Sequence, residues 1–247
     1  MLINLLFFIL SIVPSVLIIV RLRNRKKNDP LYLQSCKSAI IRGLVCVLPI
    51  LVVSATFHLV RNLLIRFVFP DMNPLVSQAI YTFIVLAYSE ELVKYFMFRR
   101  VLSKNADNFS MADITAFMVI IGTAFGLVED IPYAIGATPV IMIIRGFTMG
   151  HVGYGFLMGW LYGKRIKTGK KIYGIAAFGL PFLIHGLYDF SLSEELLKLN
   201  DNLAFIGISL ALLDIVLLIL MVRFFLVSRK KESGIVQLSE KAVEVNP

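Results

Sequence analysis

Seven apolar stretches, each about as long as a membrane-crossing helix, follow one another along the chain. The hydrocarbon core of a bilayer is about 30 Å thick, and an α-helix crosses it in about 20 residues. Inside that core the backbone must satisfy its own hydrogen bonds, which a continuous apolar stretch does as a helix. We therefore expect an all-α, polytopic membrane helix bundle with about seven transmembrane helices, at residues 2–20, 39–60, 75–98, 112–135, 139–162, 172–190 and 203–225.

The basic residues indicate how this bundle is oriented. The net charge is +9, but the lysines and arginines cluster at the ends of apolar stretches, so we expect a lipid bilayer and not nucleic acid as a partner. Cytoplasmic loops are enriched in Lys and Arg. Eighteen of these residues fall at one set of helix ends and three at the other. We expect a multi-pass integral cell membrane protein with its N-terminus outside and its C-terminus in the cytoplasm.

The chain is expected to form one domain. Residues 1–225 form the predicted transmembrane bundle, and residues 226–247 form a polar cytoplasmic tail that is too short for a core of its own. Since the connections between stretches are short as well, any chemistry has to come from side chains of the helices.

Ionisable residues inside the apolar stretches are the strongest functional signal. Each costs roughly 2.5 to 3.5 kcal/mol at the centre of a membrane helix, so such residues usually face a protein interior or a wet cavity and serve a function. We single out ten of them, which lie in the last five of the seven stretches. The residues are Glu90, Glu91, Lys94, Glu129, Asp130, Arg145, His151, His185, Asp189 and Asp214.

The third stretch contains the run SEELVK at residues 89–94. Its adjacent carboxylates point about 100° apart on a helix, and Lys94 lies one turn away, within reach of either. One glutamate can therefore be paired while the other faces a cavity and acts on water as a general base. The alternative is a pair of acids at the cytoplasmic interface beside Arg99 and Arg100, although Glu91 lies about 12 Å of helix rise from Arg99.

Two histidines lie on consecutive stretches. His185 and Asp189 are one helical turn apart, so the carboxylate can orient the imidazole or both can face one reacting centre. His151 is flanked by glycines, which allow a neighbouring helix or a substrate to approach closely. A single membrane histidine is more often a packing residue, but two histidines and carboxylates on two other helices favour a shared site. Spacing identifies no partner for Asp214.

Helix rise tests whether these residues lie at one depth. Counted from the cytoplasmic end of each stretch, Glu91 lies about 11 to 12 Å in, His151 about 17 Å and His185 about 20 Å. Glu129 comes out at about 26 Å by the same count. A shared cavity therefore requires the fourth helix to be tilted, to start late or to break near Gly122 and Gly126.

In chain order, these residues resemble the PrsW family of intramembrane proteases, which is related to the CAAX prenyl protease superfamily. The likeness runs over residues 89–190 in four pieces on four stretches: an EExxK motif, a GLVE run, a histidine, and a second histidine in an HGxxDF context. Family members often carry Asn where this chain has Asp130. The matching residues are Glu90, Glu91, Lys94, Glu129, His151, His185 and Asp189.

The resemblance implies a peptidase that works within or near the bilayer, and a site below the surface favours a membrane-anchored protein substrate. Lys94 and Arg145 are expected to support the site. The expected catalytic residues are Glu90, Glu91, His151, His185 and Asp189.

Two mechanisms are compatible with this residue set. In the one we favour, His151, His185 and Glu129 bind Zn²⁺ and leave a position open for water. In the other, Glu90 or Glu91 is the base, and the two histidines stabilise the oxyanion without a metal.

Two further functions are weighed against this hypothesis. A CAAX-type processing protease for lipidated C-termini would need a lateral opening for a lipid chain. A membrane transporter or proton relay also uses intramembrane acids and histidines, but it predicts inverted repeats, and the sequence contains none that we can identify.

Overall fold

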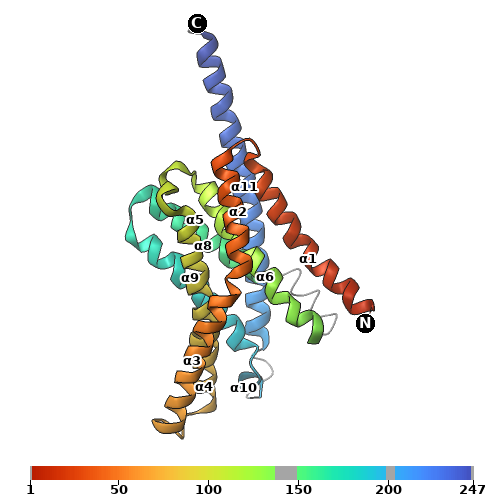
Figure 1. Ribbon diagram of the computed structural model, residues 1–247, viewed down its shortest axis with the longest axis vertical. Coiled ribbons are helices and arrows are strands. Elements are labelled where there is room, and N and C mark those ends of the chain that lie inside the picture. Colours follow the sequence, from red (N-terminus) through yellow and green to blue (C-terminus); the bar gives the residue numbers. More distant parts are fainter. Residues whose placement is uncertain (1, 137–148, 199–203, 246–247) are drawn as a thin grey trace.

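The computed structural model describes residues 2–136, 149–198 and 204–245, and within these ranges the chain is helical with no strand, as expected (Figure 1). The elements are α1 (Leu2–Arg23), η1 (Asn24–Lys26), α2 (Pro30–Val45), α3 (Val47–Phe67), α4 (Pro74–Ile80), η2 (Tyr81–Tyr88), α5 (Ser89–Leu102), η3 (Ser103–Asn108), α6 (Met111–Gly136), α8 (Gly150–Thr168), α9 (Lys171–Ser191), α10 (Glu194–Leu197) and α11 (Ala204–Val245).

Helix α6 forms the centre of the bundle and packs against α1, α2 and α8. Its side chains Ile114, Phe117, Ile120 and Ile121 are completely buried and belong to the main hydrophobic core. The neighbouring helices therefore separate α6 from the surroundings along most of its length. The C-terminal part of α6, which carries Glu129, is less buried and leads into the cavity described below.

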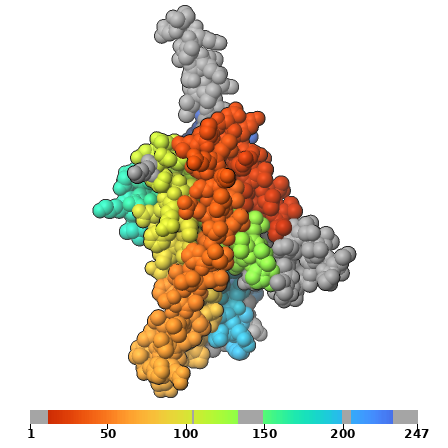
Figure 2. Space-filling model, in the orientation of Figure 1, coloured from red at the N-terminus to blue at the C-terminus, as the bar shows by residue number. Residues whose placement is uncertain are grey.

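Four helices in the described part of the chain are long and apolar enough to cross a membrane. They correspond to the second, fourth, sixth and seventh expected stretches. Large apolar side chains such as Leu48, Val52 and Ile219 are exposed on α3 and α11, and Figure 2 shows α3, in orange, at the surface of the face in view. A surface of this kind suits contact with lipid better than contact with water. The four spans are Pro30–Phe67, Met111–Pro132, Lys171–Ser191 and Phe205–Lys231.

The third expected stretch is helical, but its winding changes along its length. It comprises α4, the π-helix η2 and α5, which follow one another directly. A π-helix has a wider turn than an α-helix and is often found at functional sites. In this chain it ends immediately before Ser89, so the change in winding helps to set the direction in which Glu90 and the residues after it project.

The fifth expected stretch differs from the prediction at both ends. Helix α8 begins at Gly150, and Met149 before it has left-handed backbone angles, with φ 46° and ψ 46°. A single uninterrupted helix over 139–162 is therefore wrong. At its other end, α8 continues to Thr168. Arg145 lies outside the described residues.

Glycines bring α8 into backbone contact with the antiparallel α6. A Cβ atom at Gly122 would lie 2.3 Å from the carbonyl oxygen of His151, and one at Gly155 would lie 2.9 Å from that of Met118. Small residues of this kind let membrane helices pack closely. Because Gly126 has no side chain, there is room for the His151 ring beside it. The glycines therefore fix the position of His151 along α6.

A buried network of ion pairs joins the N-terminal helices to α6. The Asp113 carboxylate, in the first turn of α6, accepts hydrogen bonds from Arg25 and from Lys26 Nζ, the latter at 2.7 Å. Asp113 also accepts from the Ser110 backbone N–H, and its own N–H donates to Ser110 Oγ, which is a capping-box arrangement. The Asp113 carboxylate therefore both caps the N-terminus of α6 and links η1 to that helix.

Replacing Asp113 with alanine is expected to destabilise the protein by about 3 to 5 kcal/mol, because it removes the buried carboxylate of an ion pair together with a helix cap. Thermal unfolding in detergent measures the loss as a lower Tm. Glu194→Ala is the matched control, since its pair with Lys198 is exposed and is expected to contribute nothing measurable. Equal Tm values for Asp113→Ala and the wild type would contradict the assignment.

Candidate active site

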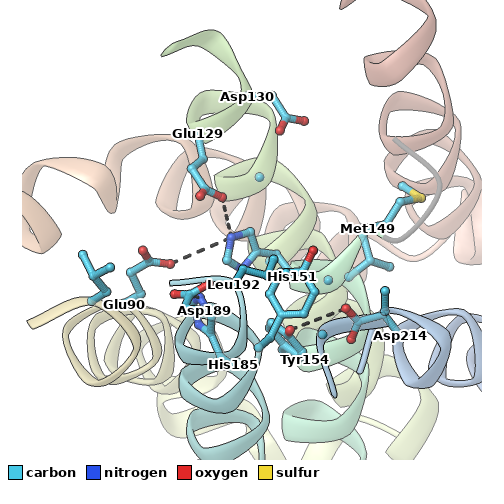
Figure 3. Close-up of a pocket in the computed structure, with 18 of the residues that line it drawn as sticks. Glu90, Glu129, Asp130, Met149, His151, Tyr154, His185, Asp189, Leu192 and Asp214 are labelled. Carbon is cyan, nitrogen blue, oxygen red and sulfur yellow. Dashed lines mark hydrogen bonds and ion pairs between the residues drawn. The ribbon is translucent and has the colours of Figure 1, made fainter. Parts of the chain in front are cut away.

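The ionisable residues of five helices, α5, α6, α8, α9 and α11, meet around one cavity of about 650 Å³ (Figure 3). This is the size of a small-molecule or peptide-segment site. The cavity lies near the C-terminal ends of α6 and α9 and at the N-terminal start of α8. These helix ends are remote from the η1 and η3 connections. The ionisable lining residues and their phenol neighbours are Glu90, Glu129, Asp130, His151, Tyr154, His185, Tyr188, Asp189 and Asp214.

Glu91 and Lys94 form a fully buried ion pair beneath this cavity. The Lys94 ammonium lies 2.6 Å from Glu91 Oε1 and 3.6 Å from Glu90 Oε2, so it reaches both carboxylates, as their spacing predicts. It also lies 4.6 Å from the centre of the Phe125 ring, in a cation–π contact. Because a buried charge is costly without a partner, Glu91 and Lys94 hold each other in place.

His185 lies between two carboxylates from different helices. Its Nδ1 is 3.0 Å from Glu91 Oε1 on α5, and its Nε2 is 3.3 Å from Asp189 Oδ2 one turn further along α9. The predicted i,i+4 pairing of His185 with Asp189 is therefore present. Both ring nitrogens face carboxylate oxygens, so the orientation of the imidazole is determined by α5 and α9 together.

His151 lies on the opposite side of the cluster, between two glutamates (Figure 3). Its Nε2 is 2.5 Å from Glu129 Oε2 and 3.8 Å from Glu90 Oε2. Its Nδ1 is 3.1 Å from Lys94 Nζ. The rings of His151 and His185 are 5.3 Å apart. The two imidazoles therefore lie within one constellation, as the ordered motifs predicted.

The expected mismatch in depth is absent because α8 is longer than the apolar stretch from which it was predicted. His151 lies 17 residues before the end of α8 at Thr168, and Glu129 lies 18 residues after the start of α6 at Met111. Both distances amount to roughly 26 Å of helix rise. No break near Gly122 is needed, since α6 runs through that position without interruption.

The side chains present fit a divalent metal ion. Ligand atoms of Glu90, Glu91, His151 and His185 lie within 4.8 Å of one another. Among the described residues, the Oε2 atoms of Glu90 and Glu91 are buried and have no hydrogen-bond partner. Imidazole and carboxylate groups at this spacing form the usual donor set for catalytic zinc. Glu129, the predicted third ligand, lies next to this group through its contact with His151.

The structure thus brings together the predicted residues Glu90, Glu91, Lys94, Glu129, His151, His185 and Asp189. It also adds two residues for which the sequence suggested no role. Asp214 on α11 lies 3.5 Å from the hydroxyl of Tyr154, and the Tyr154 ring stacks on His185. Asp214 is unusual in an otherwise apolar stretch, but no spacing rule connects it to a residue 60 positions away.

Comparison with known proteins places this constellation in a family. The sequence profile of the PrsW family of intramembrane metalloproteases matches residues 37–227. The chain belongs to the PrsW family. The match extends the expected resemblance from residues 89–190 to most of the bundle, including the C-terminal part of α2, all of α3 and the apolar part of α11 as far as residue 227.

Two relatives named Protease PrsW are similar to the chain. That of Shouchella clausii (strain KSM-K16) is 30% identical over 152 residues, which are 60% of this chain and 70% of that protein. That of Oceanobacillus iheyensis is 30% identical over 114 residues, which are 44% of this chain and 53% of that protein. No solved structure matches the chain at a significant level.

Membership of the PrsW family identifies the chain as a peptidase embedded in the membrane, with a protein as its substrate class. Neither a transporter nor a CAAX-type processing enzyme is favoured by these relatives. The family is described as one of metalloproteases, which agrees with the fit of the buried donor set to a divalent ion.

Proposed function

We propose that the chain is an intramembrane endopeptidase in which Glu90 is the general base. The side chain of Glu90 lines the cavity and is 14% exposed, whereas that of Glu91 is 1% exposed and lies outside the lining. Water in the cavity can therefore reach Glu90. In this mechanism Glu90 accepts a proton from the water that attacks the scissile carbonyl, and it delivers that proton to the leaving amine. The placement of Glu90 on the cavity carries the proposal.

The adjacent Glu91 has a positioning role in this mechanism. It is already paired with Lys94 and contacts His185, so it holds the ammonium and the imidazole at fixed places around the cavity. Asp189 restrains the other nitrogen of His185. Fixed polar groups of this kind stabilise developing charge without reorganising during the reaction.

His151, His185 and Glu129 are our proposed zinc ligands. Their support is that all three residues line the cavity, with Glu129 next to His151 and the centres of the two imidazole rings 5.3 Å apart. A bound zinc ion would polarise the scissile carbonyl and make the attacking water more acidic. The protein side chains hold the donor atoms on three different helices, so the site depends on the packing of α6, α8 and α9.

One contact favours the second, metal-free mechanism. When the Lys94 ammonium donates to His151 Nδ1, at 3.1 Å, the hydrogen of a neutral imidazole resides on Nε2. That N–H is suited to stabilising an oxyanion, whereas a metal ligand needs a free lone pair on Nε2. The metal-bound mechanism therefore requires that Lys94 pairs only with Glu90 and Glu91 and does not donate to His151 Nδ1.

The proposed substrate is a membrane-anchored protein, and the proposed topology has about seven transmembrane helices with the N-terminus outside. Residues 1–225 form the bundle, and residues 226–247 form a cytoplasmic tail, in which α11 continues as a helix to Val245. The connections 24–29 and 169–170 lie in the half of the bundle from which the end of α11 projects, and 68–73 lies at the opposite end (Figure 1).

A β-lactamase fused to residue 247 tests this orientation. It is expected to confer no ampicillin resistance in a bacterial host, because the enzyme would stay in the cytoplasm. Ampicillin resistance would show that the C-terminus is outside and would reverse the proposed orientation.

The proposed activity is tested by co-expressing the chain with a panel of single-span membrane proteins and locating the cleaved bonds by mass spectrometry. Since the cavity lies near the ends of α6 and α9 remote from the cytoplasmic connections, cleavage is expected in the outer half of the apolar segment or just beyond it. Cleavage that is confined to soluble proteins, or to cytoplasmic tails, would contradict the proposal.

A further inference from the structure

Asp214 is a buried carboxylate in a helix that otherwise suits a bilayer. The span Phe205–Lys231 is long and apolar enough to cross a membrane, yet Asp214 within it is 1% exposed. Its Oδ1 is buried and makes no hydrogen bond to any described residue. Burying a carboxylate is unfavourable when one of its oxygens lacks a hydrogen bond. A residue this unfavourable in lipid and in a protein core needs a specific role.

The partner of Asp214 is the phenol of Tyr154 on α8. Asp214 Oδ2 accepts a long hydrogen bond, 3.5 Å, from the Tyr154 hydroxyl, and both residues line the cavity. In Figure 3 this pair lies on the side of His151 opposite to Glu90. Asp214 therefore reaches the site from a helix to which the motif-based resemblance assigned no part in the chemistry.

The Tyr154 ring lies against both histidines of the site. It stacks on His185 with ring centres 5.2 Å apart and an interplanar angle of 25°. It meets His151 edge to face, with ring centres 6.0 Å apart and an angle of 82°. Rotation of this phenol about its side-chain bonds would therefore remove one wall of the space that both imidazoles occupy.

Two glycines allow α11 to come this close to α8. A Cβ atom at Gly150 would lie 3.2 Å from Asp214 Oδ2 and 3.3 Å from the Tyr154 hydroxyl. One turn further on, a Cβ atom at Gly153 would lie 3.2 Å from the Leu217 side chain. The two positions lie on the same face of α8, but only a Cβ atom at Gly150 would meet the side chains of the polar pair; at Gly153 it would meet Leu217 and, at 3.8 Å, the backbone oxygen of Asp214.

We propose that Asp214 is a positioning residue of the active site that acts through Tyr154 on His185. The carboxylate anchors the phenol, and the stacked phenol ring holds the imidazole in the orientation in which it faces Glu91 and Asp189. This inference rests on the proposed peptidase function and extends the site to α11. The competing explanation is structural: Asp214 lies near the first residue of α8 and would favour that helix N-terminus by its charge alone.

The test measures kcat and KM of the purified full chain on a membrane-anchored reporter that the wild type cleaves. Asp214→Ala and Tyr154→Phe are each expected to lower kcat about tenfold, the lower end of the range for partners that orient functional histidines, with KM within about twofold. The double variant is expected to be no slower than either single one, because both substitutions break one link. Asp214→Asn, whose amide oxygen accepts from the phenol, is expected to retain most of kcat.

Three results would overturn the inference: a wild-type kcat for Tyr154→Phe, multiplicative losses in the double variant, or an Asp214→Asn variant as slow as Asp214→Ala. The last of these indicates that only the charge near α8 matters. If the wild type cleaves no reporter at all, the proposed function itself fails. If the wild type cleaves the reporter, Glu90→Gln abolishes cleavage and Tyr154→Phe leaves it unchanged, then the proposed peptidase function stands and only the role of Asp214 is rejected.

A matched pair of glycine substitutions provides a second test without removing any polar group. Gly150→Ala inserts a methyl group against the side chains of both Asp214 and Tyr154, and Gly153→Ala inserts the same group against Leu217. Both strain the packing of α8 on α11, and a similar decrease in Tm is expected. Only Gly150→Ala is expected to lower kcat about tenfold. Equal kcat values for the two variants would contradict the positioning role.

Discussion

Replacement of Glu90 by glutamine is expected to slow cleavage of a membrane-anchored substrate by at least about 100-fold, since general-base catalysis contributes about 10² to 10⁴ in rate. Glutamine has the size of glutamate but cannot accept the proton of the attacking water. Glu90 lines the cavity, its Oε2 makes no hydrogen bond to a described residue, and Lys94 at 3.6 Å keeps its closer partner Glu91 at 2.6 Å, so this substitution should leave the Tm close to that of the wild type.

Glu91→Gln is the informative comparison, because it changes the neighbouring carboxylate and has a different expected outcome. It leaves Lys94 buried without its closest partner, 2.6 Å away, and a broken buried pair costs about 3 to 5 kcal/mol. Glu91→Gln is therefore expected to lower the Tm and to lose activity together with stability. A stable, inactive Glu91→Gln beside an active Glu90→Gln would assign the base to Glu91 instead.

Zinc content is the second property for which we expect a large effect. Elemental analysis of the detergent-purified wild type is expected to find about one zinc per chain, and the double variant His151→Ala, His185→Ala is expected to contain none, because a catalytic zinc site takes about three protein ligands. Among the three histidines of the chain, His58 provides the control. It contacts Asn62 on α3, away from the cavity, so His58→Ala should keep its metal.

Zinc content also distinguishes the zinc-dependent mechanism from the metal-free oxyanion mechanism. Glu129→Gln is expected to reduce zinc content, whereas Glu90→Gln is expected to retain it, since the proposal makes only Glu129 a ligand. Absence of zinc from every form, in a protein that still cleaves its substrate, would favour the oxyanion mechanism. Lys94 would then be responsible for keeping the hydrogen of His151 on Nε2.

Sequence reasoning found most of the site because its signals are local. The pairing of Lys94 with both glutamates and that of His185 with Asp189 follow from i,i+3 and i,i+4 spacing on a helix, and both are present. The order of the motifs along the chain also predicted the family, which the profile match confirms. These features depend on helix geometry alone, so they can be read without knowing how the helices pack.

Features that depend on helix boundaries were predicted less well. Hydropathy ended the fifth stretch at residue 162, whereas the basic C-terminal turn of α8 extends it to Thr168. That difference of six residues, about 9 Å of helix rise, produced the apparent mismatch in depth between His151 and Glu129. The left-handed Met149 and the π-helix before Ser89 were likewise not predicted, because both depend on contacts with other helices.

The sequence by itself determined that the chain is a helical membrane protein of the PrsW family with glutamates and histidines inside its helices, because apolar length and helical spacing act over a few turns. Only the tertiary structure decided that Glu90 rather than Glu91 faces the cavity and that Asp214 joins the site. Two adjacent glutamates are equivalent until neighbouring helices bury one of them. Likewise, Asp214 and Tyr154 meet only because glycines on α8 admit α11.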